Sequence, residues 1–225
     1  MTDNKDKGTK KRKRGIETKR AILDTAAELF AKNGFDGVSM REIANGTGIK
    51  ESSIYNHFES KAAILETLFE EFIRLIPGTR PSDEELDKML VMMNPEELFK
   101  AILFYVGKSV HGTLAHTTRI INHEKFRNPR AAEMYYKYLV NEPASYYERL
   151  ICKMIERQKI KPVDARIMAE QYNYISIALT DEYIMSQNGL ADEHSVVKYM
   201  ITTLHFFCHL MKEDVGRYDG KKDEI

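Results

Sequence analysis

The sequence predicts an all-α protein, in which a short amino-terminal three-helix domain precedes a larger helical domain. Three observations lead to this prediction. Apolar residues recur at three- and four-residue steps along most of the chain. Prolines, glycines and capping residues divide these periodic stretches into helix-sized segments. No stretch alternates strictly as a half-buried strand would, and no glycine-rich nucleotide-binding motif is present.

The composition is that of a globular protein. The chain has 225 residues, 43% of them apolar, and its 34 Lys and Arg balance 34 Asp and Glu, which suits one large or two small domains. No apolar run reaches the roughly 18 residues of a membrane-spanning helix, and charged residues rather than an apolar leader follow Met1. Because Cys152 and Cys208 are the only cysteines, no disulfide framework is expected. We therefore expect a cytoplasmic protein with no membrane partner.

Charge is unevenly distributed along the chain. Residues 1–61 carry 13 Lys and Arg against 9 Asp and Glu, and the densest basic run is KKRKR at residues 10–14. After Met1, residues 2–14 have no apolar side chain with which to order themselves by burial. We expect a flexible basic arm over residues 1–14, which either contacts a polyanion such as DNA or serves as a solubilising tail.

The first helix of the amino-terminal region is expected to begin near Thr18 and to stop at Asn33 and Gly34. Its apolar face consists of residues at helical spacing, namely Ile22, Leu23, Ala26, Ala27, Leu29 and Phe30. Ser39 and Glu42 have the spacing of a capping box, in which each side chain binds a backbone N–H at the start of a helix. A second, short helix is therefore expected after Ser39 and through Ala44.

A tight turn is expected at residues 46–48, Gly-Thr-Gly, because glycine readily adopts positive φ. A third short helix is expected over residues 52–58, with Ile54 and Phe58 on one face. Ser60 is expected to cap a fourth helix. Two short helices joined by a glycine-containing turn, behind a longer helix, form the outline of a helix-turn-helix.

The helix-turn-helix hypothesis explains the side chains of the third helix. Its inner face must anchor to the supporting helices, which Ile54 and Phe58 do, while its outer face must enter a major groove about 12 Å wide. The outward side chains are hydrogen-bonding groups: Ser52, Ser53, Tyr55 and Asn56. A helical bundle that binds no DNA also has short helices, so the outline alone leaves that alternative open.

These segments resemble the amino-terminal domain of TetR-type transcriptional regulators. The resemblance lies in TKRAILDTAAELFAKNGF at residues 18–35, GVSMREIA at 37–44, GIKESSIYNHF at 48–58, and the following Ser60 and Lys61. The glycine turn, the tyrosine three positions before Phe58 and the lysine that opens the fourth helix all fall in register with the family pattern. Residues 123–129, HEKFRNP, are similar to a junction in many carboxy-terminal domains of the family.

The resemblance implies double-stranded DNA as a partner, with several residues contacting its backbone. Thr18 and Ser39, at the starts of two helices, would offer hydroxyl and backbone N–H groups to phosphates. Tyr55, His57 and Lys61 match positions that usually touch the DNA backbone in the family.

Other positions match residues that face the base edges in the family. These are Glu51, Ser52 and Asn56, with Lys50 and Ser53 beside them. Lys50 stands where a small capping residue is usual, and Glu51 where a lysine or a neutral group is common. A glutamate accepts from cytosine N4 but is repelled by phosphates, so the operator sequence stays open.

About five helices are expected after Pro81. Their boundaries are marked by Asn94-Pro95, Asn128-Pro129, Glu142-Pro143, Pro162 and Asn188-Gly189. We predict that residues 15–61 form the DNA-binding domain and residues 62–225 a helical ligand-binding and dimerisation domain.

The last two predicted helices are apolar on more than one side. One carries a stripe of Met168, Tyr172, Ile175, Leu179 and Tyr183, widened by Ile177 and Ile184. The other carries Val196, Met200, Leu204, Phe207 and Met211, beside a second stripe of Val197, Ile201 and Cys208. A helix at the edge of a monomer needs one apolar face, so we expect a homodimer through these helices, the alternative being a helix pair wholly inside one monomer. A dimer would present two recognition helices to a palindromic operator.

A small-molecule effector is expected in the middle of the chain, where aromatic rings alternate with a few polar groups. The candidate ligand-binding residues are Phe104, Tyr105, His111, His116, Arg119, Tyr136, Tyr147 and Tyr174. Most of these tyrosines could equally be core or surface residues, and Arg119 could pair internally with Glu124.

The function predicted from the sequence is a DNA-binding transcriptional regulator, with a repressor as the commonest form in the resembling family. An activator of the same fold, a helical enzyme and an adaptor that binds no DNA are the alternatives. His205, Cys208 and His209 have metal-ligand spacing but no evident fourth ligand, and no nucleophile motif is present. We therefore expect no cofactor, no metal site and no catalytic residue.

Overall fold

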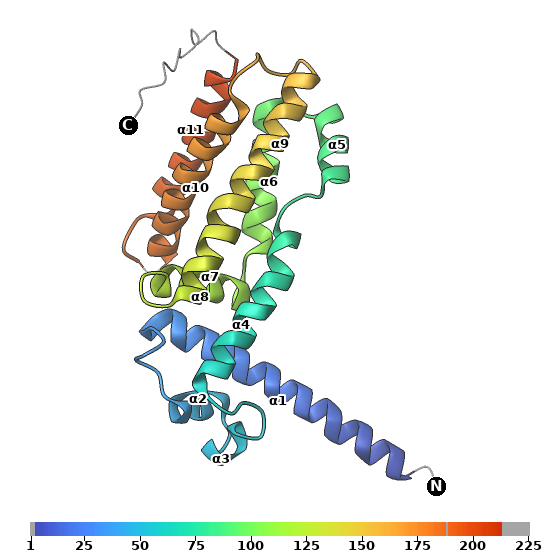
Figure 1. Ribbon diagram of the computed structural model, residues 1–225, viewed down its shortest axis with the longest axis vertical. Coiled ribbons are helices and arrows are strands. Elements are labelled where there is room, and N and C mark those ends of the chain that lie inside the picture. The colour runs from blue at the N-terminus through green and yellow to red at the C-terminus, as the bar shows by residue number, and fades with distance from the viewer. Residues whose placement is uncertain (1–2, 188, 213–225) are drawn as a thin grey trace. The chain divides into compact units, whose positions relative to one another are not determined.

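The structure is a computed structural model, which describes the backbone of residues 3–187 and 189–212 and the side chains of residues 12–186 and 189–212. All regular secondary structure in this part of the chain is helical, and no strand occurs among the described residues (Figure 1). The all-α prediction is therefore confirmed.

Packing divides the chain into two compact units. The first unit comprises Met1–Thr79 and Lys108–Tyr135, and the second comprises Arg80–Gly107 and Tyr136–Ile225. This grouping differs from the predicted division after residue 61, because α4 (Lys61–Leu75), α7 (Gly112–Glu124) and α8 (Pro129–Met134) belong with the amino-terminal helices. The predicted functional boundaries remain a prediction.

The first helix, α1, spans Asp3–Asn33. Its predicted end is confirmed, since Gly34 follows with a φ of +74°. Its predicted start near Thr18 is wrong, because α1 continues backward through the basic run at residues 10–14. Lysine and arginine are good helix formers, so the run extends the helix although residues 12–14 lie exposed. Movement of this basic segment remains a prediction.

Three helices and a 3₁₀ turn follow α1 in the first unit. The second helix, α2, spans Met40–Thr47, α3 spans Glu51–Ile54, and α4 leads into a 3₁₀ turn at Ile76–Thr79. The capping box predicted before α2 is present, and the hydroxyl of Ser60 accepts from the backbone N–H of Ala63 at the start of α4. Helix α2 is longer than predicted and α3 is shorter.

The core of the first unit forms where α1 packs on α2, α4 and α7. The buried residues on α1 include Ile22, Ala26 and Phe30, as the helical spacing predicted. A Cβ on Gly46 would lie 2.7 Å from Cγ2 of Thr25 on α1. The absence of a side chain at Gly46 therefore lets α2 approach α1 closely.

The second unit is built from longer helices. They are α5 (Asp83–Met92), α6 (Pro95–Ser109), α9 (Glu142–Glu156), α10 (Ala165–Gln187) and α11 (Glu193–Leu210). The predicted boundaries at Asn94-Pro95, Asn128-Pro129 and Pro162 are confirmed, whereas Glu142-Pro143 does not interrupt the helix: a π-helical segment, Tyr135–Asn141, leads directly into α9. Gly189 has positive φ after the end of α10, and Asn188 lies outside the described residues.

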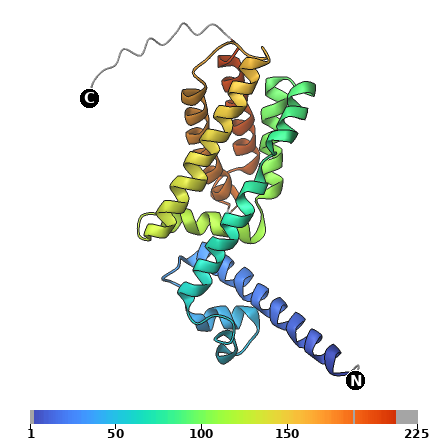
Figure 2. The same cartoon turned by 45° about the vertical axis from the view of Figure 1, so that its right-hand side comes forward.

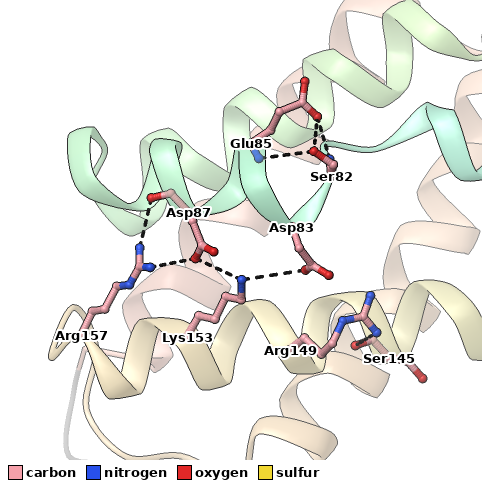
Figure 3. Close-up of polar contacts among 8 residues, drawn as sticks. All are labelled: Ser82, Asp83, Glu85, Asp87, Ser145, Arg149, Lys153 and Arg157. Atoms are coloured by element: carbon pink, nitrogen blue, oxygen red, sulfur yellow. Dashed lines mark hydrogen bonds and ion pairs between the residues drawn. The ribbon is translucent and has the colours of Figure 1, made fainter.

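More helices follow Pro81 than the five expected. Helix α5 went unpredicted, although Ser82 and Glu85 form the same kind of capping box as Ser39 and Glu42 (Figure 3). Three ion pairs join α5 to α9 and its C-cap: Nζ of Lys153 lies 3.0 Å from Asp87 and 3.9 Å from Asp83, and the C-cap Arg157 lies 2.7 Å from Asp87. These contacts attach α5 along one side of α9.

Aromatic rings form the centre of the second unit. The ring of Tyr172 on α10 lies 5.0 Å from that of Phe99 and 4.7 Å from that of Tyr147, between centroids, and 5.4 Å from that of Phe207 on α11. Both Figures 1 and 2 show α9, α10 and α11 running side by side. Tyr147 and Tyr172 are buried, and this burial raises the pKa of both phenols.

Candidate nucleic-acid interface

The turn between α2 and α3 has the geometry expected of a helix-turn-helix. Gly48 adopts a φ of +72°, and the N–H of Ile49 donates to the carbonyl of Ala44 at 3.0 Å. Only glycine adopts this left-handed conformation without a steric cost. The prediction of a glycine-dependent turn is therefore confirmed at Gly48, while Gly46 serves helix packing instead.

The helix after this turn is anchored on one face. Ile54 is fully buried and Phe58 is 5% exposed, as predicted. The α-helix ends at Ile54, yet the N–H groups of His57 and Phe58 still bond to the Ile54 carbonyl. Residues 51–58, here called the recognition segment, thus consist of one α-helical turn followed by hydrogen-bonded turns. The predicted helix to residue 58 was therefore too long.

The other face of the recognition segment points to solvent. Tyr55 is 51% exposed, and Lys50, Glu51, Ser52 and Asn56 are also exposed. Ser53 and His57 are half-buried. This surface consists of hydroxyl, amide and charged groups, which are the groups that read base edges and bind phosphates. The candidate base-facing residues therefore lie together on one accessible surface.

Ser39 is engaged in capping α2. Its hydroxyl and its backbone N–H each lie 2.7 Å from Oε2 of Glu42, and the Glu42 N–H donates back to the hydroxyl at 3.2 Å. These hydrogen bonds lower the pKa of Glu42. Because both polar groups of Ser39 already have partners, the predicted phosphate contact gains no support from the geometry and stays a prediction.

Thr18 does not stand at a helix start. It lies within α1, where its hydroxyl donates to the carbonyl of Arg14 at 2.8 Å. The backbone N–H of Thr18 is therefore not one of the free N–H groups at a helix start, and that part of the prediction is wrong. The physical reason is the extension of α1 through the preceding basic residues.

Lys61 binds backbone carbonyls of the loop after α1, a contact that the sequence did not predict. Its ammonium group donates to the carbonyls of Phe35 at 2.7 Å and Val38 at 2.8 Å, and lies 4.3 Å from the centre of the Phe35 ring. These contacts tie the start of α4 to the loop between α1 and α2. An ammonium has three N–H donors, so a phosphate contact through the third stays a prediction.

Further contacts link α1 and α7 to the recognition segment and to the loop after α1. The ammonium of Lys19 on α1 lies 5.2 Å from the centre of the Phe58 ring. The buried carboxylate of Glu124 on α7 accepts from the Phe35 N–H at 3.3 Å and from Arg127 at 3.5 Å. Sequence reasoning had suggested Arg119 as the partner of Glu124. The similarity of residues 123–129 to a family junction was the only signal for this contact.

Three of the predicted ligand-binding residues line two different cavities. A groove of about 830 Å³ in the first unit is lined by α1, α4 and α7 and includes His111 and His116. A cavity of about 90 Å³ in the second unit includes Tyr147. The others lie elsewhere: Phe104, Tyr105, Tyr136 and Tyr174 are exposed on the surface, and Arg119 is half-buried.

The groove in the first unit contains a connected polar cluster. Arg20 bonds to Glu71 at 2.8 Å and to Thr113 at 3.0 Å, and also pairs with Asp24 at 2.9 Å. Beside the cluster, burial lowers the pKa of His116, while Glu28 opposes that shift. The groove is therefore lined by charged residues on one side and by apolar residues such as Phe72.

The metal candidate on α11 has other interactions. Nδ1 of His205 lies 3.2 Å from Glu96 on α6, and burial raises the pKa of Cys208 to about 11. A thiol with that pKa is protonated at neutral pH, whereas metals bind the thiolate. Within the described residues, no three His, Cys, Asp or Glu side chains gather in a metal-binding arrangement.

No helix within the described residues combines the length and apolarity needed to cross a bilayer.

Comparison with known proteins agrees with this geometry. The family described as bacterial regulatory proteins, tetR family, matches residues 22–68. The HTH-type transcriptional regulator YerO of Bacillus subtilis is 38% identical over 69 residues, 31% of this chain and 24% of YerO. The biofilm operon icaADBC HTH-type negative transcriptional regulator IcaR of Staphylococcus aureus is 44% identical over 45 residues, 20% of this chain and 24% of IcaR. The matches thus span about a quarter of the length of these relatives.

Solved structures share the fold over most of the chain. A TetR-family transcriptional regulator of Mesorhizobium loti superposes with a TM-score of 0.60 at 17% identity, covering 88% of this chain and 98% of that one. Salmonella enterica GusR gives a TM-score of 0.58 at 21% identity, covering 87% of this chain and 95% of GusR. AibR in complex with isovaleryl coenzyme A and operator DNA gives a TM-score of 0.56 at 19% identity, covering 83% of this chain and 97% of AibR.

An all-α fold with a glycine turn and an exposed polar recognition segment defines a helix-turn-helix protein. Together with the family match over residues 22–68, it supports a TetR-family regulator.

Proposed function

We propose that this protein is a TetR-family transcriptional repressor that binds a palindromic DNA operator as a homodimer. The observation that carries the proposal is the recognition segment, in which Ile54 and Phe58 are buried while Ser52, Tyr55 and Asn56 lie exposed. A surface of this composition suits the edges of bases in the major groove. The name of IcaR, a negative transcriptional regulator, supports repression over the alternative of activation.

Exposed apolar side chains support dimerisation through α10 and α11. Together these helices expose Ile167, Tyr174, Ile175, Met185, Val197, Tyr199 and Phe206, each at least 37% accessible. Two of the predicted stripes mix exposed and buried residues. Ile175 is exposed although Tyr172 of the same stripe is buried, and Cys208 is buried although Val197 of the same stripe is exposed. Large apolar surface of this kind is usual at a subunit interface. Two copies would offer two recognition segments to half-sites about 34–36 Å apart.

A small molecule would act by changing the affinity for DNA. AibR, which shares the fold, has been solved in complex with both isovaleryl coenzyme A and operator DNA, and this supports an effector here. The groove of about 830 Å³ has the size of a ligand pocket, whereas the cavity of about 90 Å³ is smaller than most. Ligand binding regulates only if it favours one arrangement of the protein over another.

The proposal includes a cytoplasmic location, where the operator DNA lies, and no catalytic activity. An activator would bind DNA in the same way and is distinguished by a transcription assay. A helical enzyme or an adaptor would show no preference for any DNA sequence.

Selection of bound sequences from random duplex DNA, followed by gel-shift titration, tests the proposal. We expect a palindromic site, binding that weakens steeply as salt rises, and a loss of about tenfold in affinity for Asn56→Ala, because a base contact is worth about 1–3 kcal/mol. Tyr55→Phe should also weaken binding. Tyr105→Phe, which removes another exposed hydroxyl, is the control and should bind normally. Failure to enrich any sequence in low salt would refute the proposal.

A further inference from the structure

Arg80 is a partly buried cation that has no counter-ion among the described residues. It lies two residues before Ser82, the N-cap of α5, and its guanidinium lies 5.7 Å from the centre of the Tyr146 ring on α9. Among the described residues it makes no hydrogen bond and no ion pair. Burial lowers its pKa, which reflects the cost of removing a positive charge from water. Arginines out of solvent normally pair with a carboxylate or phosphate.

The aromatic partner of Arg80 also carries an unsatisfied group. Tyr146 is 6% exposed, and its hydroxyl is buried without a hydrogen-bond partner in the described structure. A buried hydroxyl without a partner costs about 1–3 kcal/mol. The guanidinium thus lies beside the ring whose hydroxyl has no acceptor among the described residues, and one oxyanion could satisfy both groups.

The acidic residues around Arg80 are committed elsewhere or too distant. Figure 3 shows Asp83 and Asp87 turned to Lys153 on α9 and to Arg157 at its carboxyl end. Glu142 attracts the guanidinium but lies beyond ion-pair distance. None of these carboxylates therefore completes the site.

The surroundings favour an anion that carries an apolar body. The Tyr147 ring lies 5.5 Å from that of Tyr146 and stacks 6.1 Å from that of Phe99. Tyr147 lines the small cavity of the second unit, whose lining does not include Arg80 or Tyr146. The aromatic surroundings of Tyr146 therefore suit a ligand with an aromatic or short apolar body.

We propose that Arg80 and the Tyr146 hydroxyl form a binding site for the carboxylate or phosphate group of a small aromatic or short apolar molecule. The planar guanidinium would bind two oxygens of the anion side by side, and the phenol would donate to one of them. The site belongs to the second unit, whereas the recognition segment belongs to the first. This inference rests on the proposed function in one respect: if the protein is a regulator, the ligand of the site is its effector.

Isothermal titration calorimetry on the full chain tests the site with three probes of similar shape. Benzoate carries a carboxylate, phenyl phosphate carries a phosphate, and benzamide is uncharged. At constant ionic strength we expect at least one of the anions to bind and benzamide not to bind. The stronger anion identifies which oxyanion the site prefers.

Variants connect the binding to the two residues. Arg80→Gln should weaken the preferred anion about tenfold or more, and Tyr146→Phe should weaken it by a smaller factor, since one hydrogen bond is lost. Arg166→Gln is the control, because Arg166 is an exposed arginine of the same unit that pairs with Glu170. If Arg80→Gln does not fold, Arg80→Lys keeps the charge but loses the planar pair of donors and should still weaken binding.

Glu142→Gln separates a ligand site from an internal ion pair. If Glu142 neutralised Arg80 in solution, Glu142→Gln and Arg80→Gln would destabilise the fold equally and leave anion binding unchanged, and the proposal would be wrong. We expect instead that Glu142→Gln tightens binding by removing a competing negative charge. Equal binding of benzoate and benzamide, or no binding of either anion at millimolar concentration, would also overturn it. Because none of these titrations contains DNA, their outcome is independent of operator binding.

Discussion

The two units of the protein start their helices in the same way but expose different surfaces. Ser39 with Glu42 caps α2 in the first unit, and Ser82 with Glu85 caps α5 in the second, with nearly identical bond lengths. The first unit then exposes polar side chains around Tyr55, whereas the second exposes rings such as Phe206 and leaves the Tyr146 hydroxyl unsatisfied. Local hydrogen bonds thus determine where helices start in both units. The exposed side chains differ: polar groups in the first unit suit nucleic acid, and the aromatic groups of the second unit suit the proposed protein partner and ligand.

The largest effect is expected where the second unit exposes apolar surface. Phe206→Glu would place a charge in the proposed dimer interface, and we expect self-association to weaken roughly 30-fold or more, as for an interface hot spot of about 2 kcal/mol. Operator affinity should fall in parallel. Analytical ultracentrifugation measures the change. Val91→Glu alters a residue that is 79% exposed on α5 and should leave the dimer intact. A dimer unchanged by Phe206→Glu would exclude this face as the interface.

The next effect is expected in the first unit, at the contact between Lys61 and the loop after α1. Lys61→Met keeps the apolar stem but leaves the carbonyls of Phe35 and Val38 without their donor, at a cost of about 1–3 kcal/mol. Chemical denaturation and gel shift should both respond. Lys88→Met removes an exposed lysine of α5 that pairs with Glu84, and it should cost less than about 1 kcal/mol. Equal costs for the two variants would contradict the structural role of Lys61.

The two capping boxes allow a matched comparison between the units. Ser39→Ala and Ser82→Ala should each reduce the free energy of unfolding by about 1 kcal/mol, because each removes one N-cap. Only Ser39→Ala should also weaken operator binding, since α2 supports the recognition segment. Thermal melting and gel-shift titration of both variants measure the two effects. A similar loss of DNA affinity in both would mean that capping affects binding only through overall stability.

The smallest effect concerns pH and the groove of the first unit. Burial and the charge of Arg119 lower the pKa of His116, while Glu28 and Asp24 oppose the shift. Because the folded-state pKa lies below the unfolded value of about 6.5, the neutral imidazole contributes stability above that pH, and this contribution is lost as pH falls toward the folded-state pKa. Melting curves from pH 8 to pH 5 should show that wild type loses more stability than His116→Asn. Parallel curves would show that His116 does not titrate differently on folding.

Some site features followed directly from sequence and others required the folded chain. The spacing of Ile54 and Phe58 predicted which face is buried, and the residues between them predicted what is exposed. The bonds of Lys61 to the loop after α1 could not be predicted, because they join residues more than 20 positions apart. The same holds for Glu124 and Phe35, which are 89 positions apart.

The sequence by itself determined the helical class, the glycine turn, the caps at Ser39 and Ser60 and the polar face of the recognition segment. Each of these depends on residues within about four positions of one another, where backbone geometry is decided locally. Tertiary structure alone decided that α4 and α7 join the first unit, that His111 and Tyr147 line different cavities, and that Arg80 lies near Tyr146 with no counter-ion among the described residues. These outcomes depend on how distant helices pack, which helical periodicity does not encode.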